Sequence, residues 1–311
     1  MQYRKLGKSD LNVSVVGLGT WAMGNDFWGA SDDAESVNAI QSALDQGINL
    51  IDTAPVYGSG HSEKIVGKAI RGRRDEVVLA TKVGIKKSGK GIYMTLKPES
   101  IRQEIEDSLR RLGTDHVDLY QIHRPDPDTP LEESLTELER LKEQGKFRYL
   151  GVSNFSRELL EQSLKSSFII SDQPHYSMLE REMENDIIPF CMDKHIGILA
   201  YGPLGGGILA GKYRAKPEFE KGDYRDRFYN FYQEPAWSKI QDLLTILKKI
   251  AESHSETIAN IVIAWTIKQN GITSALVGAR KMEQAVSNAG AGNVILSESE
   301  IKMINDAIPA L

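Results

Sequence analysis

Residues 117–153 read VDLYQIHRPDPDTPLEESLTELERLKEQGKFRYLGVS, and this stretch decides the fold class. The apolar runs Val117–His123 and Phe147–Ser153 are too short for core helices, and their residues do not alternate between apolar and polar. Such runs are typical of strands covered on both faces, as in a parallel sheet. Between the runs, leucines recur at the spacing of one helix face, at positions 131, 135, 138 and 141. The stretch therefore predicts a strand, a helix and a second strand of a parallel sheet.

Local signals predict where helices begin and end. Thr129-Pro130-Leu131-Glu132 has the pattern of a capping box with proline at the first helical position. Gly145 follows the last leucine of this helix as a stop signal. The spacing of Ser297 and Glu300 predicts a similar start for a last helix.

The same order of strand and helix recurs along the chain. Six further apolar runs, each bounded by turn residues, are Val13–Gly19, Ile48–Thr53, Val77–Lys82, Phe168–Gln173, Ile196–Gly202 and Thr273–Ala279. With the two runs above they predict a closed (β/α)8 TIM barrel, and the alternative is an open doubly wound sheet with fewer strands. Because no linker or shift in composition interrupts the pattern, residues 1–311 are predicted to form a single domain.

Three segments fall outside the repeating unit. Residues before Val13 are predicted to form an N-terminal hairpin that closes the bottom of the barrel. Extra helices, including the one from Ser297, are expected near the carboxyl terminus. The irregular stretch 214–235 is too long for a routine connection, so we interpret it as a lid.

Composition narrows the class of protein. The 311 residues are 41% hydrophobic and 26% charged, which is ordinary for a globular protein. The 38 basic and 43 acidic residues give a net charge of −5, which argues against a nucleic-acid-binding surface. A single cysteine, Cys191, excludes an intrachain disulfide and a cysteine-cluster metal site. With no apolar stretch of membrane-spanning length and no pattern of a signal peptide, we expect a cytoplasmic protein without a metal or a membrane partner.

Polar residues stand at or just after the ends of the predicted strands. They include Asp52, Tyr57, Lys82 and His123, and the strand ends of a barrel surround one opening. An ammonium group favours a phenolate, so Lys82 is expected to lower the pKa of Tyr57, while Asp52 holds Lys82 in place. His123 could hydrogen-bond a substrate oxygen or share the proton. Such a set would protonate a carbonyl oxygen, and since no side chain supplies the attacking group, a hydride-carrying cofactor is implied.

Two other interpretations of these residues are open. Strand ends are often polar simply because they meet water. A Schiff-base role for Lys82 is also possible in principle, although an adjacent Asp52 would keep the amine protonated.

Segments along the whole chain resemble the aldo-keto reductases, in the order in which that family has them. They are Gly17-Leu18-Gly19-Thr20-Trp21, Asp52-Thr53-Ala54-x-x-Tyr57-Gly58, Lys82, Gln121-Ile122-His123, Gly151–Phe155, Gln173-Pro174, Tyr201–Tyr213 and Gly278–Asn288. The resemblance implies a barrel enzyme that reduces aldehydes or ketones with a nicotinamide cofactor, normally NADPH, bound without a Rossmann domain. By match to that family, Tyr57 is the general acid, Lys82 and Asp52 tune it, and His123 orients the carbonyl.

The resemblance also implies where the cofactor binds. The nicotinamide would lie among Thr20, Trp21, Asp52, Ser153, Asn154 and Gln173, with Tyr201 stacked on its ring. The pyrophosphate loop would be Gly202, Pro203, Leu204, Gly205 and Gly206 with Lys212. The adenosine end would contact Gly278, Ala279, Arg280, Gln284 and Asn288. We expect the substrate pocket to be formed by Trp21, Trp28, Tyr57, His123 and Arg124.

Arg280 gives an argument for NADPH from the residues themselves. It is expected to open a short helix after the eighth strand, where a helix start and a guanidinium together favour phosphate. This position suits the 2′-phosphate of NADPH, so NADH is the less favoured cofactor.

A nicotinamide-binding regulatory or sensor subunit with little turnover is the alternative function. Arg124-Pro125-Asp126-Pro127 also resembles the cytoplasmic β subunits of potassium channels, which share this fold. In those relatives an asparagine typically replaces the fourth-strand histidine, so the presence of His123 favours an enzyme.

Overall fold

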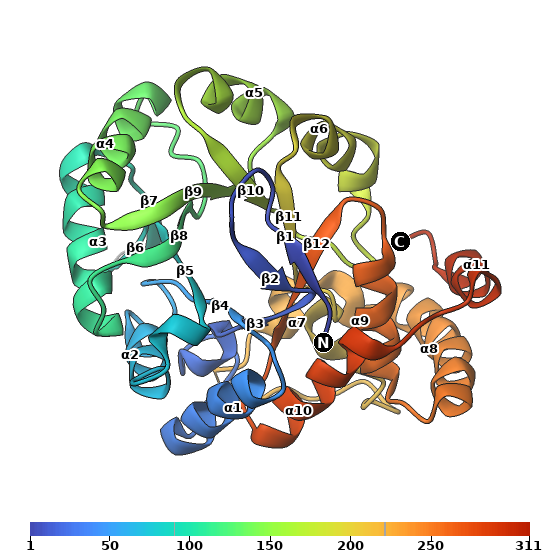
Figure 1. The fold of residues 1–311 in the computed structure, drawn as a ribbon. Helices are drawn as coiled ribbons and strands as arrows, with labels where there is room; N and C mark the ends of the chain where they lie inside the picture. Colours follow the sequence, from blue (N-terminus) through green and yellow to red (C-terminus); the bar gives the residue numbers. More distant parts are fainter. Residues whose placement is uncertain (90, 221) are drawn as a thin grey trace.

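The computed structural model describes residues 1–89, 91–220 and 222–311. Among these residues, eight parallel strands close into a barrel in the order β10-β11-β12-β3-β4-β5-β8-β9 (Figure 1). Their bounds are β3 Val16–Gly19, β4 Leu50–Asp52, β5 Val78–Val83, β8 Val117–Ile122, β9 Phe147–Ser153, β10 Ile169–Gln173, β11 Gly197–Tyr201 and β12 Ile272–Gly278. The predicted closed barrel is confirmed, and the open doubly wound sheet is wrong.

Helices surround the barrel and bury its outer face. They are α1 Asp33–Asp45, α2 His61–Ala69, α3 Pro98–Leu112, α4 Leu131–Glu143, α5 Arg157–Ser166, α6 Ile187–Lys194, α9 Ile258–Lys268 and α10 Met282–Gly290. The helices α8 (Ala236–His254) and α11 (Glu298–Ala307) pack against each other beyond this ring, as the prediction of extra carboxyl-terminal helices requires. The apolar faces of the helices and the outward side chains of the strands form the larger core.

A hairpin closes the bottom of the barrel, as predicted. β1 (Tyr3–Lys5) pairs antiparallel with β2 (Asn12–Ser14), and the hairpin lies across the barrel opening in Figure 1. Leu6, Leu11 and Val13 pack with apolar side chains inside the barrel. The predicted boundary was wrong, because Val13 pairs with Arg4 in the hairpin and the barrel strand begins at Val16.

The helix signals of the sequence have mixed outcomes. The capping box at Ser297 is present, with Glu300 as its partner. The capping box at Thr129 is absent: Pro130 stands at the N-cap, and the Thr129 hydroxyl donates to Asp126 at 2.6 Å. The Thr129 hydroxyl therefore binds Asp126, three residues earlier in the chain, and does not cap the helix as the capping-box pattern predicts.

Segments between strands and helices build a rim at the carboxyl ends of the strands. The stretch 214–235, in which Lys221 lies outside the described residues, contains the short helix α7 (Arg225–Phe228). It lies against the loop after β3, where Tyr224 N–H donates to the Phe27 carbonyl at 3.1 Å. A hairpin of β6 (Ile85–Ser88) and β7 (Gly91–Met94), which the sequence analysis did not predict, follows β5. Whether 214–235 moves as a lid stays a prediction.

Candidate active site

Four of the predicted residues meet at the carboxyl ends of β4, β5 and β8. Lys82 is fully buried, and its Nζ donates to the Asp52 carboxylate, to the Thr53 carbonyl at 3.0 Å and to the Tyr57 hydroxyl at 3.2 Å. The ring of His123 stands edge-on to that of Tyr57, with 5.8 Å between the ring centroids. The structure thus brings together side chains from positions 52 to 123 around one phenol.

Burial dominates the ionisation of this group. Burial and the charges of Asp52 and Asp26 raise the pKa of Tyr57 well above its ordinary value. Lys82 was predicted to lower this pKa, but the net shift is in the opposite direction, because removal of the hydroxyl from water outweighs the effect of the nearby amine. Burial also lowers the pKa of Lys82, and the Asp52 carboxylate opposes that effect. Burial, Lys82 and Arg124 together hold the pKa of His123 well below its usual range.

These shifts define what the group can do near neutral pH. Tyr57 keeps its proton, and His123 is a neutral imidazole that can donate one hydrogen bond and accept another. A phenol that holds a proton beside an amine at 3.2 Å can deliver that proton to an oxygen atom above it. The amine then stabilises the phenolate that remains.

The second oxygen of Asp52 is held by two buried amides. The Nε2 atoms of Gln121 and Gln173 each donate to Asp52 Oδ1 at 2.9 Å, and Gln173 Nε2 also reaches Gln121 Oε1 at 3.0 Å. The sequence analysis assigned no function to Gln121. Its signal was a polar residue near the end of a buried strand, directly opposite Lys82 in the register of β5 and β8.

Further predicted residues form a chain of hydrogen bonds beside this group. The Ser153 hydroxyl donates to the Gln173 carbonyl at 2.7 Å, and Asn154 Nδ2 donates to Ser153 at 2.8 Å. The Tyr201 hydroxyl donates to Asn154 Oδ1 at 3.0 Å. Thr20 follows the adjacent strand β3, and its hydroxyl donates to the Asp52 carbonyl at 3.0 Å.

His175, which no sequence pattern predicted to be functional, lies beside Tyr201. The two rings stack with centroids 4.9 Å apart and 14° between their planes. Burial, assisted by Arg124, lowers the pKa of His175 to about 4. Its Nε2 atom is buried and has no hydrogen-bond partner among the described residues.

The predicted pyrophosphate loop follows Tyr201 and is rich in positive φ angles. Gly202, Gly205 and Gly206 have φ angles of 73°, 53° and 66°, which only glycine adopts without strain. A side chain at Gly206 would also collide with the Tyr229 ring, since an added Cβ would lie 2.5 Å from it. The buried Arg225, which the sequence analysis did not single out, donates to the Gly206 carbonyl at 3.3 Å. Pro203 and Leu204 lie within the same turn, and Lys212 beyond it is exposed.

The residues predicted for the adenosine end hold one another and a neighbouring loop. Arg280 N–H donates to Gln284 Oε1 at 2.8 Å, and Asn288 Nδ2 donates to the Gly278 carbonyl at 3.3 Å, around the buried Ala279. The Arg280 guanidinium donates to the carbonyls of Trp28 and Ala30, both at 3.1 Å. Arg280 does not open the helix as predicted: α10 begins at Met282, because Lys281 keeps an extended backbone.

Aromatic rings pack against Tyr57 and against one another. Trp21 stacks on Tyr57 with 6.0 Å between centroids and meets Trp28 edge-on at 5.3 Å. Phe228, from the stretch 214–235, meets Trp21 edge-on at 5.8 Å. Arg124, directly after His123, is exposed. The predicted substrate-pocket residues therefore lie along one rim.

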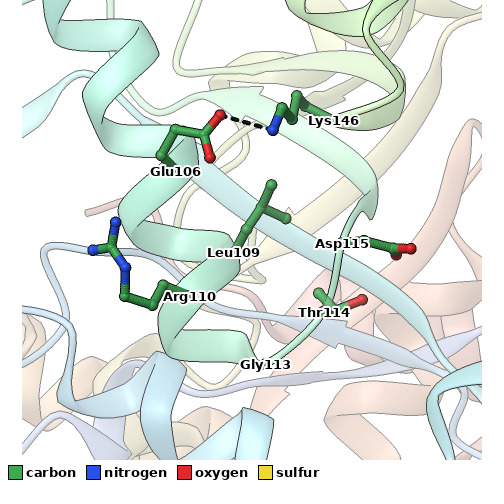
Figure 2. A pocket seen from close by; sticks show the side chains of 7 residues that line it. All are labelled: Glu106, Leu109, Arg110, Gly113, Thr114, Asp115 and Lys146. Atoms are coloured by element: carbon green, nitrogen blue, oxygen red, sulfur yellow. Dashed lines mark ion pairs between the residues drawn. The ribbon is translucent and has the colours of Figure 1, made fainter.

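A separate hollow of about 760 Å³ lies on another part of the surface (Figure 2). It lies between the end of α3, the loop before β8 and Lys146, and an ion pair of 2.8 Å joins Lys146 to Glu106. These segments precede β8 and β9, so the hollow is at the opposite end of the strands from Tyr57.

The described residues provide neither a membrane-spanning helix nor a cluster of metal ligands. No helix in the described part of the chain is both long and apolar enough to cross a membrane. Within residues 1–89, 91–220 and 222–311, no group of three or more histidine, cysteine, aspartate or glutamate side chains is placed to hold a metal ion.

The parallel eight-stranded barrel gathers a tyrosine, a lysine, an aspartate and a histidine at its strand ends, which is the arrangement that the resemblance of the sequence to carbonyl-reducing enzymes implies. Residues 15–309 match the model of the aldo/keto reductase family. The chain belongs to this family, and it is an NAD(P)H-dependent oxidoreductase.

Similar proteins cover nearly the whole chain. Aldo-keto reductase YhdN of Bacillus subtilis is 39% identical over 98% of this chain and 93% of its own length. The NADH-specific methylglyoxal reductase of Escherichia coli is 35% identical over 98% of both chains. The structure of the glycerol dehydrogenase AKR11B4 from Gluconobacter oxydans has a TM-score of 0.90 and 38% identity, and covers 98% of this chain and 94% of that one.

Proposed function

We propose that residues 1–311 act as one unit that reduces aldehydes or ketones to alcohols with NADPH, with Tyr57 as the general acid. The observation that carries this proposal is the position of the Lys82 amine. It contacts the Asp52 carboxylate and also donates to the Tyr57 hydroxyl, at 3.2 Å. Asp52 keeps the amine charged, and the amine lowers the cost of forming the Tyr57 phenolate.

The proton moves along a short path. The carbonyl oxygen of the substrate accepts a hydrogen bond from Tyr57 and a second one from the neutral ring of His123, which orients it. As negative charge develops on that oxygen, the Tyr57 proton transfers to it, and Lys82 stabilises the remaining phenolate. When bound, the nicotinamide supplies the hydride that reduces the carbonyl carbon.

Residues beside Tyr57 fit a nicotinamide nucleotide. Ser153, Asn154 and Gln173 offer amide and hydroxyl groups for the carboxamide, and Tyr201 offers an aromatic face. The His175 Nε2 atom is buried beside Gly202 and has no hydrogen-bond partner among the described residues, which fits a polar ligand group at this place. The loop from Gly202 to Gly206, with Lys212, would take the pyrophosphate, while Thr20 and Trp21 close the nicotinamide end.

The preference for NADPH rests on Arg280. Its guanidinium is held by the carbonyls of Trp28 and Ala30, where a 2′-phosphate would meet a fixed cation. The E. coli relative is named as NADH-specific, which makes the comparison of the two cofactors the decisive test of this part of the proposal.

The test compares two buried tyrosines. Purified protein is mixed with NADPH and 4-nitrobenzaldehyde, and the loss of nicotinamide absorbance is followed for the wild type, Tyr57→Phe and the control Tyr120→Phe. The Tyr120 hydroxyl is fully buried on β8 and has no hydrogen-bond partner among the described residues, so its removal should leave the rate unchanged. Tyr57→Phe should abolish turnover while NADPH still binds. Equal rates for wild type and Tyr57→Phe would remove Tyr57 from the proposed function.

A further inference from the structure

We propose that Gln121 is a positioning residue for carbonyl reduction, because its buried amide fixes the Asp52 carboxylate that holds Lys82. The inference rests on the proposed function of Tyr57, Lys82 and Asp52. Gln121 itself lies behind Asp52 and acts on the reacting atoms only through that carboxylate and the Lys82 amine.

The geometry forms a closed triangle of polar groups. Gln121 Nε2 donates to Asp52 Oδ1 at 2.9 Å, Gln173 Nε2 donates to the same oxygen at 2.9 Å, and Gln121 Oε1 accepts from Gln173 Nε2 at 3.0 Å. All three residues are at least 97% buried. The amino group of Gln173 is thereby occupied, which leaves its amide oxygen to face a ligand. Gln121 therefore links Asp52 to a residue of the proposed nicotinamide site.

The intervening strand is shaped to let this triangle form. Gly151 on β9 is the register partner of Gln121 on β8, and β9 separates β8 from β10, which carries Gln173. A Cβ at Gly151 would lie 2.5 Å from Ser171 Oγ and 3.2 Å from Gln121 Cγ. A position without a side chain is thus required for the amide of Gln121 to cross toward Gln173.

The charges explain why the triangle matters. Asp52 meets Lys82 through Oδ2 and the two amides through Oδ1. The two amide hydrogen bonds to Oδ1 fix the orientation of the carboxylate, so that Oδ2 stays on the Lys82 amine. Because Lys82 is fully buried, its charge depends on that carboxylate. Loss of one amide donor should weaken the ammonium that faces Tyr57.

The first test replaces the amide by an apolar side chain of similar length. Gln121→Met should lower kcat about tenfold, while the Kd of NADPH changes by less than about threefold. Because Lys82 then loses its proton more easily, the high-pH limb of the kcat profile should move to lower pH by about one unit. The matched control is Gln269→Met. It removes a side-chain hydrogen bond of 2.9 Å from Gln269 Nε2 to the Trp265 carbonyl, outside the site, and should leave the pH profile of kcat unchanged.

The second test keeps the shape of the side chain and changes only its protonation. In Gln121→Glu the introduced carboxyl, when protonated, can still donate to Asp52, and when ionised it repels that carboxylate. Burial and the adjacent Asp52 carboxylate raise the pKa of the introduced carboxyl, so activity relative to the wild type should be high near about pH 6 and collapse toward about pH 9. A purely structural role predicts the same relative activity at both pH values.

The outcomes separate this inference from the proposed function. If Gln121→Met has the kcat and the pH profile of the wild type, or if Gln121→Glu shows no dependence of relative activity on pH, the positioning role is overturned. If Tyr57→Phe keeps full activity, the proposed function fails first, whatever the Gln121 variants do. If Gln121→Met does not fold, the pH dependence of Gln121→Glu decides the matter alone.

Discussion

Asp172 on β10 tests how much the ionisation of a buried carboxyl lowers the free energy of unfolding. Its side chain is fully buried, and neither carboxylate oxygen has a hydrogen-bond partner among the described residues. Burial raises the pKa of this carboxyl from 3.8 to about 8. We predict that Asp172→Asn stabilises the protein, and that the gain grows as the pH rises.

The sign and the size follow from proton linkage. Between about pH 4 and pH 8 the folded state binds more protons at this carboxyl than the unfolded state does, so the free energy of unfolding falls as pH rises through that window. At about 1.4 kcal/mol per pH unit, the loss between pH 5 and pH 8 is about 3–4 kcal/mol. An asparagine does not ionise, so the stabilisation by Asp172→Asn should be about 3–4 kcal/mol larger at pH 8 than at pH 5.

Urea unfolding followed by circular dichroism at the two pH values measures this difference. The control is Asp118→Asn, which also changes a buried strand aspartate, but one whose carboxylate accepts from Leu79 N–H at 2.9 Å and pairs with Arg74 at 2.8 Å. The control should lose stability at both pH values, because it breaks a satisfied ion pair. A gain for Asp172→Asn that is the same at pH 5 and pH 8 would refute the reasoning.

Two further predictions concern the cofactor and the histidine. Arg280→Ala should weaken NADPH binding by about 1.5–3 kcal/mol and NADH binding much less, as measured by fluorescence titration. Lys281→Ala is the control. If Arg280→Ala weakens the binding of both cofactors equally, Arg280 does not contact the 2′-phosphate. Because burial, Lys82 and Arg124 hold the pKa of His123 well below its usual range, kcat/KM should show no inflection near about pH 6.5 as the pH falls from about 8 to 6. Arg124→Gln removes one of these charges and should move any acid limb to higher pH; an unchanged profile would count against the role of Arg124.

The barrel could be predicted from the sequence because its signals are local and repeated. Apolar runs such as Val117–His123 specify buried strands wherever they occur, and the closed order of strands follows once eight of them alternate with helices. The boundary at Val13 was missed because a strand of the hairpin and a strand of the barrel are joined with only Val15 between them. The run is continuous in sequence, although the chain changes its pairing partner within it.

The site was predictable in position but not in electrostatics. Strand ends place Asp52, Lys82 and His123 around one opening, which topology alone requires. The direction of the Tyr57 pKa depends on how deeply its hydroxyl is buried, and no local pattern encodes that depth. The functions of Gln121 and His175 were not predicted for a related reason. The function of a single polar residue depends on its partners in space, here Gln173 and Tyr201, and these lie far away in the sequence or belong to another strand.

The central claim is that the Tyr57 hydroxyl donates the proton during carbonyl reduction. A single-turnover experiment tests it most directly: enzyme loaded with NADPH is mixed rapidly with excess 4-nitrobenzaldehyde, and the nicotinamide absorbance is followed for the wild type and for Tyr57→Phe. We predict a rapid decay for the wild type and, for a variant that binds NADPH equally well, a decay slower by at least about a hundredfold. An equal decay in both proteins would contradict the claim.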